Sequence, residues 1–276
     1  MNIWDAFEIP TLEDQQNLPQ IEKLQKLRIA ESELGLESTA FNLAHPRLNE
    51  MIREHNNKVG SLIMTYTLVY HYFSAGIPDD RWYQSPGENG QSIQYMPDFA
   101  EEHWSRNMWF GYFSNVYYMI ISSIWDSVLE IINHYYDYDF PVDLRLRSNV
   151  FKKLKAEHQE IANVFTALQS DNLYTKAQEY RTAAVHGSAS NSVKDTITYE
   201  KGILVDLPVY DDSGRPVLDS KGKPMTEQKK ATRISFGIGK YTPTKVIFQN
   251  MQDYVALSAE KIHEILKLMY NAPIGE

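Results

Sequence analysis

The chain has 276 residues, 43% of them hydrophobic and 23% charged, which is ordinary for a globular protein with a sizeable core. Its formal net charge of −9 argues against broad, non-specific binding to nucleic acid, so any phosphate-binding role needs a focused basic site. The absence of cysteine excludes disulfides, thiolate catalysis and cysteine-ligated zinc; with no signal-like start and no long apolar run, the sequence favours a cytoplasmic protein without membrane spans.

The chain begins with a segment that is expected to form an arm. Pro10 and Pro19 interrupt any helix there, so residues 1–19 are interpreted as an N-terminal arm and residues 20–276 as a single domain. Apolar residues at three- and four-residue steps then predict helices over residues 20–34, 46–74, 105–136, 148–168 and 243–270. A further helix is predicted between Asp171, as its N-cap, and Gly187, as its terminator.

The pattern changes after residue 190. β-Branched and aromatic residues predict strands at 196–199, 203–210 and 232–238, separated by turn signals. Residues 195–240 are therefore expected to form an exposed β-hairpin insertion. The predicted fold class is mainly α: an up-and-down helical bundle with a β-hairpin insertion before the last helix, and without an internal repeat.

Several familiar sites are absent from the sequence. No two histidines have the spacing of a local zinc site, so no metal is expected, and no cofactor is implied either. The segment Gly237–Thr242 lacks the pattern of a phosphate-binding loop and is interpreted as a strand end and turn. Acidic pairs such as Asp79-Asp80 fall in or beside predicted loops, where solvent exposure is the expected state.

One short motif remains, Arg181-x4-His186, late on the helix predicted before Gly187. Ten arginines and eight histidines in this chain give roughly 0.3 chance matches at this spacing, so the motif by itself is weak. Its position near the end of a helix in a mainly helical chain strengthens it. The interpretation as a functional site depends on that context.

In this context the chain resembles the HEPN superfamily, helical-bundle domains in which Arg, four to six residues and His lie on the closing helix. The resemblance covers the architecture of roughly residues 105–270 and, at residue level, Arg181 and His186. Some members also carry a polar or acidic residue on the preceding long helix, where Asp126 is the candidate here. The resemblance implies metal-independent RNA cleavage, an RNA or nucleotide ligand, and a homodimer whose interface brings the Arg/His pairs together.

The residue types suit this chemistry. A histidine can take a proton from a ribose 2′-hydroxyl or give one to the leaving oxygen, and an arginine can hold phosphate oxygens in two-point contact. Arg181 and His186 are thus the candidate catalytic residues, with Asp126 and Thr182 in possible supporting roles. A five-residue step on a helix rotates by ~140°, which separates the pair unless the helix distorts or a second subunit contributes.

Other interpretations stay open. Thr182 stands where many catalytic members of the superfamily have Asn, Asp or His after the arginine. Ser188 stands where members that act as toxins have a Tyr, two residues after the His, that their antitoxin modifies, so the sequence gives less support to that role. A basic patch could support phosphate binding and comprises Arg145, Arg147, Lys152, Lys153 and Lys155, although a solvated helix start explains it equally well. The alternative functions are a non-catalytic nucleotide- or protein-binding module, or a purely structural role in which Arg181 caps helix carbonyls and His186 interacts with the helix dipole.

Overall fold

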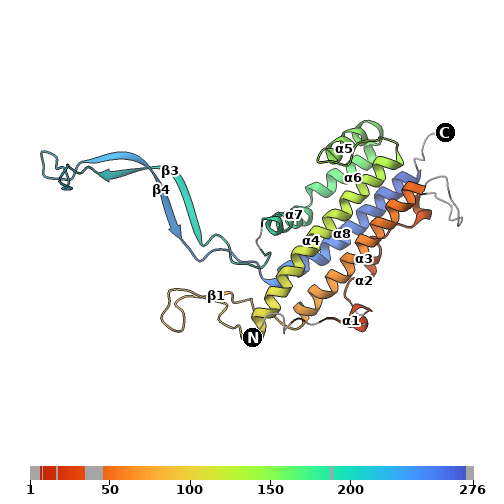
Figure 1. Cartoon of the computed structure of the whole chain (residues 1–276), viewed down its shortest axis with the longest axis horizontal. Helices are drawn as coiled ribbons and strands as arrows, with labels where there is room; N and C mark the ends of the chain where they lie inside the picture. The colour runs from red at the N-terminus through yellow and green to blue at the C-terminus, as the bar shows by residue number, and fades with distance from the viewer. Residues whose placement is uncertain (1–6, 8, 17, 35–45, 187–188, 272–276) are drawn as a thin grey trace. The chain divides into compact units, whose positions relative to one another are not determined.

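The structure, a computed structural model, describes residues 7, 9–16, 18–34, 46–186 and 189–271. In these ranges it contains eight α-helices, a short 3-10 helix and two two-stranded sheets (Figure 1). The larger sheet is a hairpin inserted before the last helix. The predicted fold class, a mainly α bundle with this insertion, is therefore confirmed.

Three long helices form the centre of the bundle and lie side by side: α3 (Pro46–Ser74), α4 (Glu101–Tyr135) and α8 (Thr244–Asn271) (Figure 1). Their apolar stripes face one another and bury large aromatic side chains. The hydroxyl of Tyr117 donates to the carbonyl of Met251 at 2.9 Å, and that of Tyr135 to the carbonyl of Met269 at 3.2 Å. These bonds satisfy polar groups that burial would otherwise destabilise.

The shorter helices show one clear departure from the sequence prediction. The single helix predicted over 148–168 is divided into α5 (Leu146–Glu157) and α6 (Gln159–Ser170). The break lies at His158, whose φ of −137° and ψ of 62° are not helical. The His158 ring stacks on Tyr136, with centroids 3.9 Å apart. No proline or glycine at this position predicts a break. The feature that accompanies it is the tertiary contact of His158 with the end of α4.

The helix predicted over 20–34 is also divided, into α2 (Ile21–Gln25) and the 3-10 helix η2 (Glu31–Leu34). The side-chain amide of Asn56, on α3, binds the intervening backbone. Its Oδ1 accepts from the N–H of Ile29 and its Nδ2 donates to the carbonyl of Ile29, both at 2.9 Å. These bonds occupy the backbone groups that a continuous helix would use.

The expected N-terminal arm, residues 1–19, makes contacts with the bundle where it is described. It includes the short helix α1 (Leu12–Gln16). The ring of Phe7 lies 4.9 Å from that of Trp109, and Leu18 is buried.

Asp79 corrects the expectation that the Asp79-Asp80 pair is solvated. Asp79 is only 2% exposed, and its carboxylate accepts from the backbone N–H of Thr244 at 2.7 Å and from its hydroxyl at 3.2 Å. Thr244 is the first residue of α8, so Asp79 caps that helix from a remote segment of the chain. Asp80 pairs with Lys245 at the surface.

The insertion is an antiparallel ribbon of β3 (Ile197–Pro208) and β4 (Thr226–Phe236). The two strands predicted at 196–199 and 203–210 are one continuous strand with a bulge between Lys201 and Ile203. Gly202 takes a φ of 76° at this bulge, a conformation that glycine adopts without steric cost. β4 begins earlier than the predicted strand at 232–238.

The tip of the ribbon contains an internal repeat, contrary to expectation. Val-Tyr-Asp-Asp-Ser-Gly-Arg-Pro at 209–216 is followed by Val-Leu-Asp-Ser-Lys-Gly-Lys-Pro at 217–224. In each copy an aspartate, Asp211 or Asp219, accepts from backbone N–H groups two and four residues later at 2.8–2.9 Å. A ring of three backbone hydrogen bonds of 2.7–2.9 Å joins Val209, Val217 and Met225.

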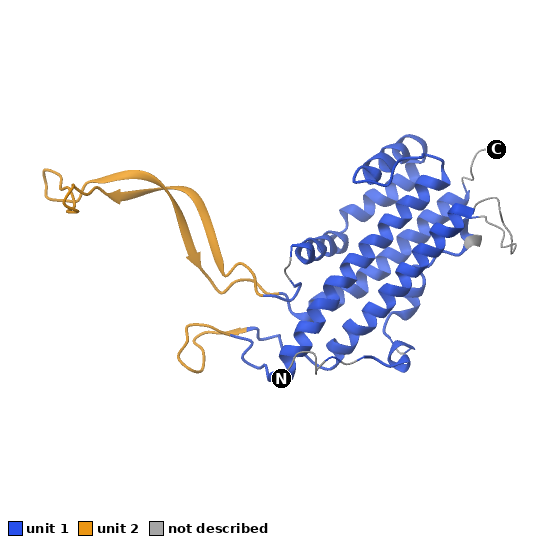
Figure 2. Cartoon of the chain, viewed as in Figure 1, with its two compact units in different colours: residues 1–82, 95–192, 242–276 blue, residues 83–94, 193–241 orange. Residues whose placement is uncertain are grey.

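The chain divides into two compact units (Figure 2). The first, residues 1–82, 95–192 and 242–276, contains the helical bundle. The second, residues 83–94 and 193–241, contains the ribbon and most of the short strands β1 (Tyr83–Gln84) and β2 (Gln94–Tyr95).

Candidate functional site

The Arg181-x4-His186 motif lies at the carboxyl-terminal end of helix α7 (Asn172–Val185). Asp171 caps the helix as predicted, accepting from the backbone N–H of Leu173 at 2.7 Å. Arg181 and Thr182 are exposed on the last turns. His186 is the C-cap residue, is exposed, and donates its backbone N–H to the carbonyl of Thr182 at 3.1 Å. Gly187 and Ser188 lie outside the described residues.

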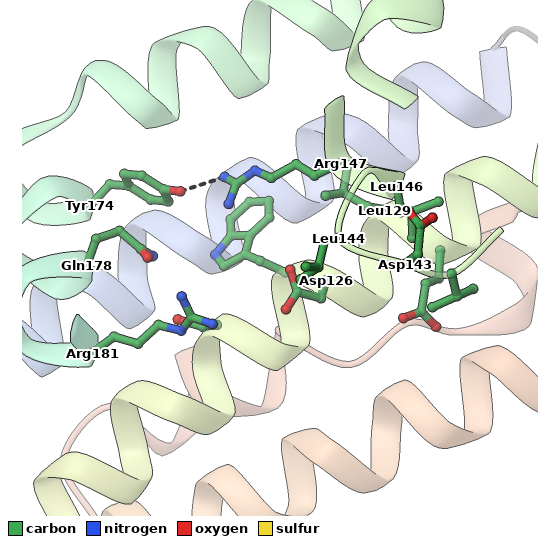
Figure 3. Close-up of a pocket in the computed structure, with 13 residues that line it drawn as sticks. Asp126, Leu129, Asp143, Leu144, Leu146, Arg147, Tyr174, Gln178 and Arg181 are labelled. Atoms are coloured by element: carbon green, nitrogen blue, oxygen red, sulfur yellow. Dashed lines mark hydrogen bonds between the residues drawn. The ribbon is translucent and has the colours of Figure 1, made fainter. Parts of the chain in front are cut away.

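A cleft of about 560 Å³ opens between α4, the start of α5 and α7, within the helical unit (Figure 3). Ser122, Trp125 and Leu129 of α4 form part of its wall. Its charged side chains come from all three sides: Asp126, Glu130, Asp143, Arg147 and Arg181. A cleft of this size, with apolar walls and a few convergent polar groups, is typical of a small-ligand site.

Two predicted residues meet in this cleft. Arg181 extends from α7 toward Asp126 of α4 (Figure 3). Asp126 is exposed, and in the part of the chain that the structure describes neither side chain takes part in a hydrogen bond or ion pair. The guanidinium donors of Arg181 are therefore available to an anionic ligand, with an acceptor on the opposite wall.

The cleft also contains residues that the Arg-x4-His motif does not predict. Arg147, from α5, donates to the hydroxyl of Tyr174 at 2.5 Å, which holds its guanidinium in the cleft. Trp125 is 6% exposed, and its indole N–H donates to Ser258 at 3.2 Å. Ser258, a small polar residue in the apolar stripe of α8, thus holds the Trp125 ring that forms part of the cleft wall.

A helical-spacing signal could have identified part of this lining. Tyr174, Gln178 and Arg181 follow one another at four- and three-residue steps, so they share one face of α7, and all three line the cleft. Arg147 had no such signal. Its sequence neighbours suggested only a basic patch.

His186 and Thr182 do not line the cleft. The reason is helical geometry: a five-residue step turns by ~140°, so His186 leaves α7 in a different direction from Arg181. One copy of the chain therefore presents the arginine of the motif in a cleft and the histidine on an exposed helix end.

The predicted basic patch is divided between different contacts. Arg147 enters the cleft, whereas Lys153 pairs with Glu157 at 2.5 Å and Lys155 lies 4.6 Å from the centre of the Phe151 ring. The patch is thus not a single phosphate-binding surface.

Neither a metal centre nor a membrane span occurs among the described residues. No cluster of three or more His, Asp or Glu residues there has the arrangement of a metal site. No helix among them combines the length and apolar character needed to cross a bilayer.

A helical bundle with Arg-x4-His at the end of a helix that lines a cleft is the arrangement expected of a HEPN-type domain. The sequence model of the HEPN_Cthe2314-like HEPN family matches residues 51–215, which is more than half of the chain. The chain belongs to this family, and the predicted membership of the HEPN superfamily is confirmed. Comparison with curated proteins and with solved structures gives no match.

Proposed function

We propose that this protein is a metal-independent endoribonuclease that acts in the cytoplasm. The observation that carries the proposal is the position of Arg181, the arginine of the family motif, whose guanidinium has no partner among the described residues and extends into a cleft large enough for a nucleotide. Family membership supports RNA as the substrate. The absence of cysteine fits a reducing compartment.

In the proposed reaction the ribose 2′-oxygen attacks the adjacent phosphorus while the bond to the 5′-oxygen breaks. His186 of a second copy takes the proton of the 2′-hydroxyl, and the leaving 5′-oxygen takes a proton from water. The products are a 2′,3′-cyclic phosphate and a 5′-hydroxyl. Arg181 holds the phosphate oxygens as negative charge builds on them, and Asp126, on the opposite wall of the cleft, accepts from that guanidinium once RNA is bound.

The separation of the two motif residues supports a composite site shared by two copies. Four apolar residues of α4, at helical steps that place them on one face, are between 38% and 55% exposed: Trp104, Met108, Tyr112 and Met119. The same face continues to Ser122 and Asp126 of the cleft. Covering this stripe with a second copy would bury it and bring another motif beside the cleft.

The central test is cleavage of a labelled RNA in EDTA by the unmodified protein and by Arg181→Ala and His186→Ala. Both variants are expected to lose activity by about a hundredfold or more, because each removes a transition-state contact. His263→Ala and Arg53→Ala are matched controls, since they alter a half-buried and an exposed residue that both lie outside the cleft. Equal cleavage by all five proteins would reveal a contaminant and sink the proposal.

A second test addresses the reaction itself. An RNA with 2′-deoxyribose at the cleaved position should resist cleavage while binding as tightly as the ribose form. The products of the ribose form should carry cyclic phosphate ends. A 3′-hydroxyl end on the products would contradict the attack by the 2′-oxygen.

The composite site is tested by mixing inactive variants. If Arg181 of one copy works with His186 of another, a heterodimer of Arg181→Ala and His186→Ala contains one intact site. Activity should then reappear on mixing, to about a quarter of the unmodified level for random pairing. Failure to recover any activity in a verified heterodimer would contradict the sharing of residues.

A second candidate function is a nucleotide-binding module without catalysis. The specific observation in its favour is that Arg147, Gln178 and Tyr174 join Arg181 in the cleft whereas His186 does not. In that case nucleotides should raise Tm without turnover, and Arg147→Ala should abolish the rise whereas His186→Ala should leave it unchanged.

A further inference from the structure

The ribbon differs in charge from the rest of the chain. Residues 193–241 contain nine Lys and Arg residues and seven Asp and Glu residues, a net charge of +2, so the remainder carries −11 and the whole chain −9. An acidic protein that handles RNA needs a local basic surface. The ribbon, with its net charge of +2, is the region that meets this need.

The strand register sorts the side chains of the ribbon into two faces. Ile197 pairs with Phe236 and Tyr199 with Ile234, and paired residues of an antiparallel sheet share a face. Lys201 follows on the same face, and Lys230 is placed there by the alternation along β4. We call these six residues the aromatic face.

The aromatic face is open. Tyr199 is 63% exposed and Phe236 is 80% exposed, and they occupy diagonal positions on neighbouring strands, roughly 7–8 Å apart. In the described part of the chain the ammonium groups of Lys201 and Lys230 have no hydrogen-bond or ion-pair partner. Two stacking platforms and two unpaired cations thus lie along one side of the ribbon.

The opposite face has a different character. In the same stretch it presents Thr198, Ser235 and an ion pair of Arg233 with Glu200 at 3.4 Å. Further out, Lys229 pairs with Glu227 at 2.5 Å. The cations of this face are therefore neutralised locally, whereas those of the aromatic face are not.

We propose that the aromatic face binds single-stranded RNA, with unpaired bases stacked on Tyr199 and Phe236 and backbone phosphates held by Lys201 and Lys230. Exposed aromatic rings on a sheet, flanked by lysines, are the chemistry by which single strands are gripped without a fixed sequence. The proposal names the substrate form and rests on the proposed function for its biological sense. Duplex RNA is a poor fit, because its bases are already stacked.

Charge favours RNA over a second copy of the chain as the occupant of the aromatic face. On this face the register adds one acid, Asp206, which is paired with Gln228, so a second copy would bring four ammonium groups, those of Lys201 and Lys230 in both copies, against two carboxylates; this excess of positive charge disfavours self-association. An RNA strand supplies the missing negative charge and the apolar ring faces at once. The aromatic face is therefore expected to bind a polyanion more tightly than it binds a second ribbon.

The test uses the full chain carrying His186→Ala, in EDTA, with a short fluorescent RNA that lacks self-complementarity. Tyr199→Val and Phe236→Val together remove the rings but keep residues that favour strands. RNA binding measured by fluorescence anisotropy should weaken by about tenfold or more, since stacking is lost for two bases. The matched control is Thr198→Val with Ser235→Val on the opposite face, which should bind as the parent does.

The lysines are tested by salt dependence. Changing Lys201 and Lys230 to Gln should reduce the slope of log affinity against log salt by about 1.4, because each phosphate contact on a single strand contributes about 0.7. Changing Lys229 and Arg233 to Gln should leave the slope unchanged. Hydrogen exchange of the ribbon amides verifies that each variant keeps its strands paired.

Three results would overturn the proposal: equal affinity of the two valine pairs, equal competition by duplex RNA, or a change of sedimentation mass in place of a change of affinity. The last result would assign the face to a second copy. Failure of the proposed function would look different. The unmodified protein would not cleave RNA, but the valine substitutions on the aromatic face would still weaken RNA binding.

Discussion

The helical unit and the ribbon use their side chains in opposite ways. In α3, α4 and α8 the large side chains pack into a shared core: Tyr66, Tyr117 and Tyr254 have no exposed surface. In β3 and β4 no residue is buried. A two-stranded ribbon gains little stability by itself, so its exposed aromatic and basic residues remain available for a partner. Stability should therefore depend on the bundle, and RNA affinity on the ribbon.

The largest difference between the two regions is expected for a leucine truncation. Leu62 of α3 is fully buried, and Leu62→Ala should lower the free energy of unfolding by about 3–4 kcal/mol through lost burial and a cavity. Leu204 of β3 is 62% exposed, and Leu204→Ala should change it by less than about 0.5 kcal/mol. Urea unfolding measures both. Equal losses of the free energy of unfolding in the two variants would mean that Leu204 is buried against another part of the protein or a second copy.

Acid should weaken the bundle through a buried histidine. Burial lowers the pKa of His55 from 6.5 to about 4, while its ring nitrogens lie 2.8 Å from the Ser127 hydroxyl and the Leu27 carbonyl. The unfolded chain therefore takes up the proton more readily than the folded chain. The contribution of the neutral His55 ring to the free energy of unfolding is complete above pH 6.5 and is lost as the pH falls toward 4. The loss over this window should reach about 3 kcal/mol.

The histidine prediction is checked by urea unfolding at several pH values. His55→Gln should be less stable than the parent at neutral pH and less sensitive to acid, whereas the half-buried control His263→Gln should follow the parent. The ribbon, residues 193–241, has no histidine, so RNA affinity of its aromatic face should stay constant between about pH 7.5 and 5.5. An unchanged acid sensitivity in His55→Gln would refute the assignment.

Two aspartates that both bind backbone N–H groups should behave differently in the two regions. Asp79→Ala removes the cap of α8 inside the bundle and should cost about 1–2 kcal/mol of global stability. Asp211→Ala removes a turn at the ribbon tip and should only speed hydrogen exchange at Ser213 and Arg215. A global effect of Asp211→Ala in urea unfolding would contradict this division.

The smallest effect is expected for the ion pair on the opposite face of the ribbon. Glu200 and Arg233 lie 3.4 Å apart, with about 60% of each side chain exposed (62% and 61%). Exposed pairs of this kind contribute little because water and salt screen them. A double-mutant cycle with Glu200→Gln and Arg233→Gln should show no measurable coupling in Tm. A clear coupling would indicate that this face is buried against something.

Much of this protein could be predicted from local sequence, because helix periodicity and capping depend on residues a few positions apart. The bounds of α3, the Asp171 cap and the placement of Arg181 and His186 at the end of α7 all follow from such patterns. The 140° step between the two motif residues also follows, since it needs only the geometry of a helix.

Tertiary structure decided what the local pattern could not contain. The break at His158 accompanies stacking on Tyr136, and the burial of Asp79 depends on Thr244, far along the chain. The same holds for the site: Arg147 reaches the cleft only because Tyr174 lies beside it in the folded bundle. Contacts between residues distant in sequence carry no periodic signal, so only the fold could decide that the residue of the motif that faces the cleft is Arg181.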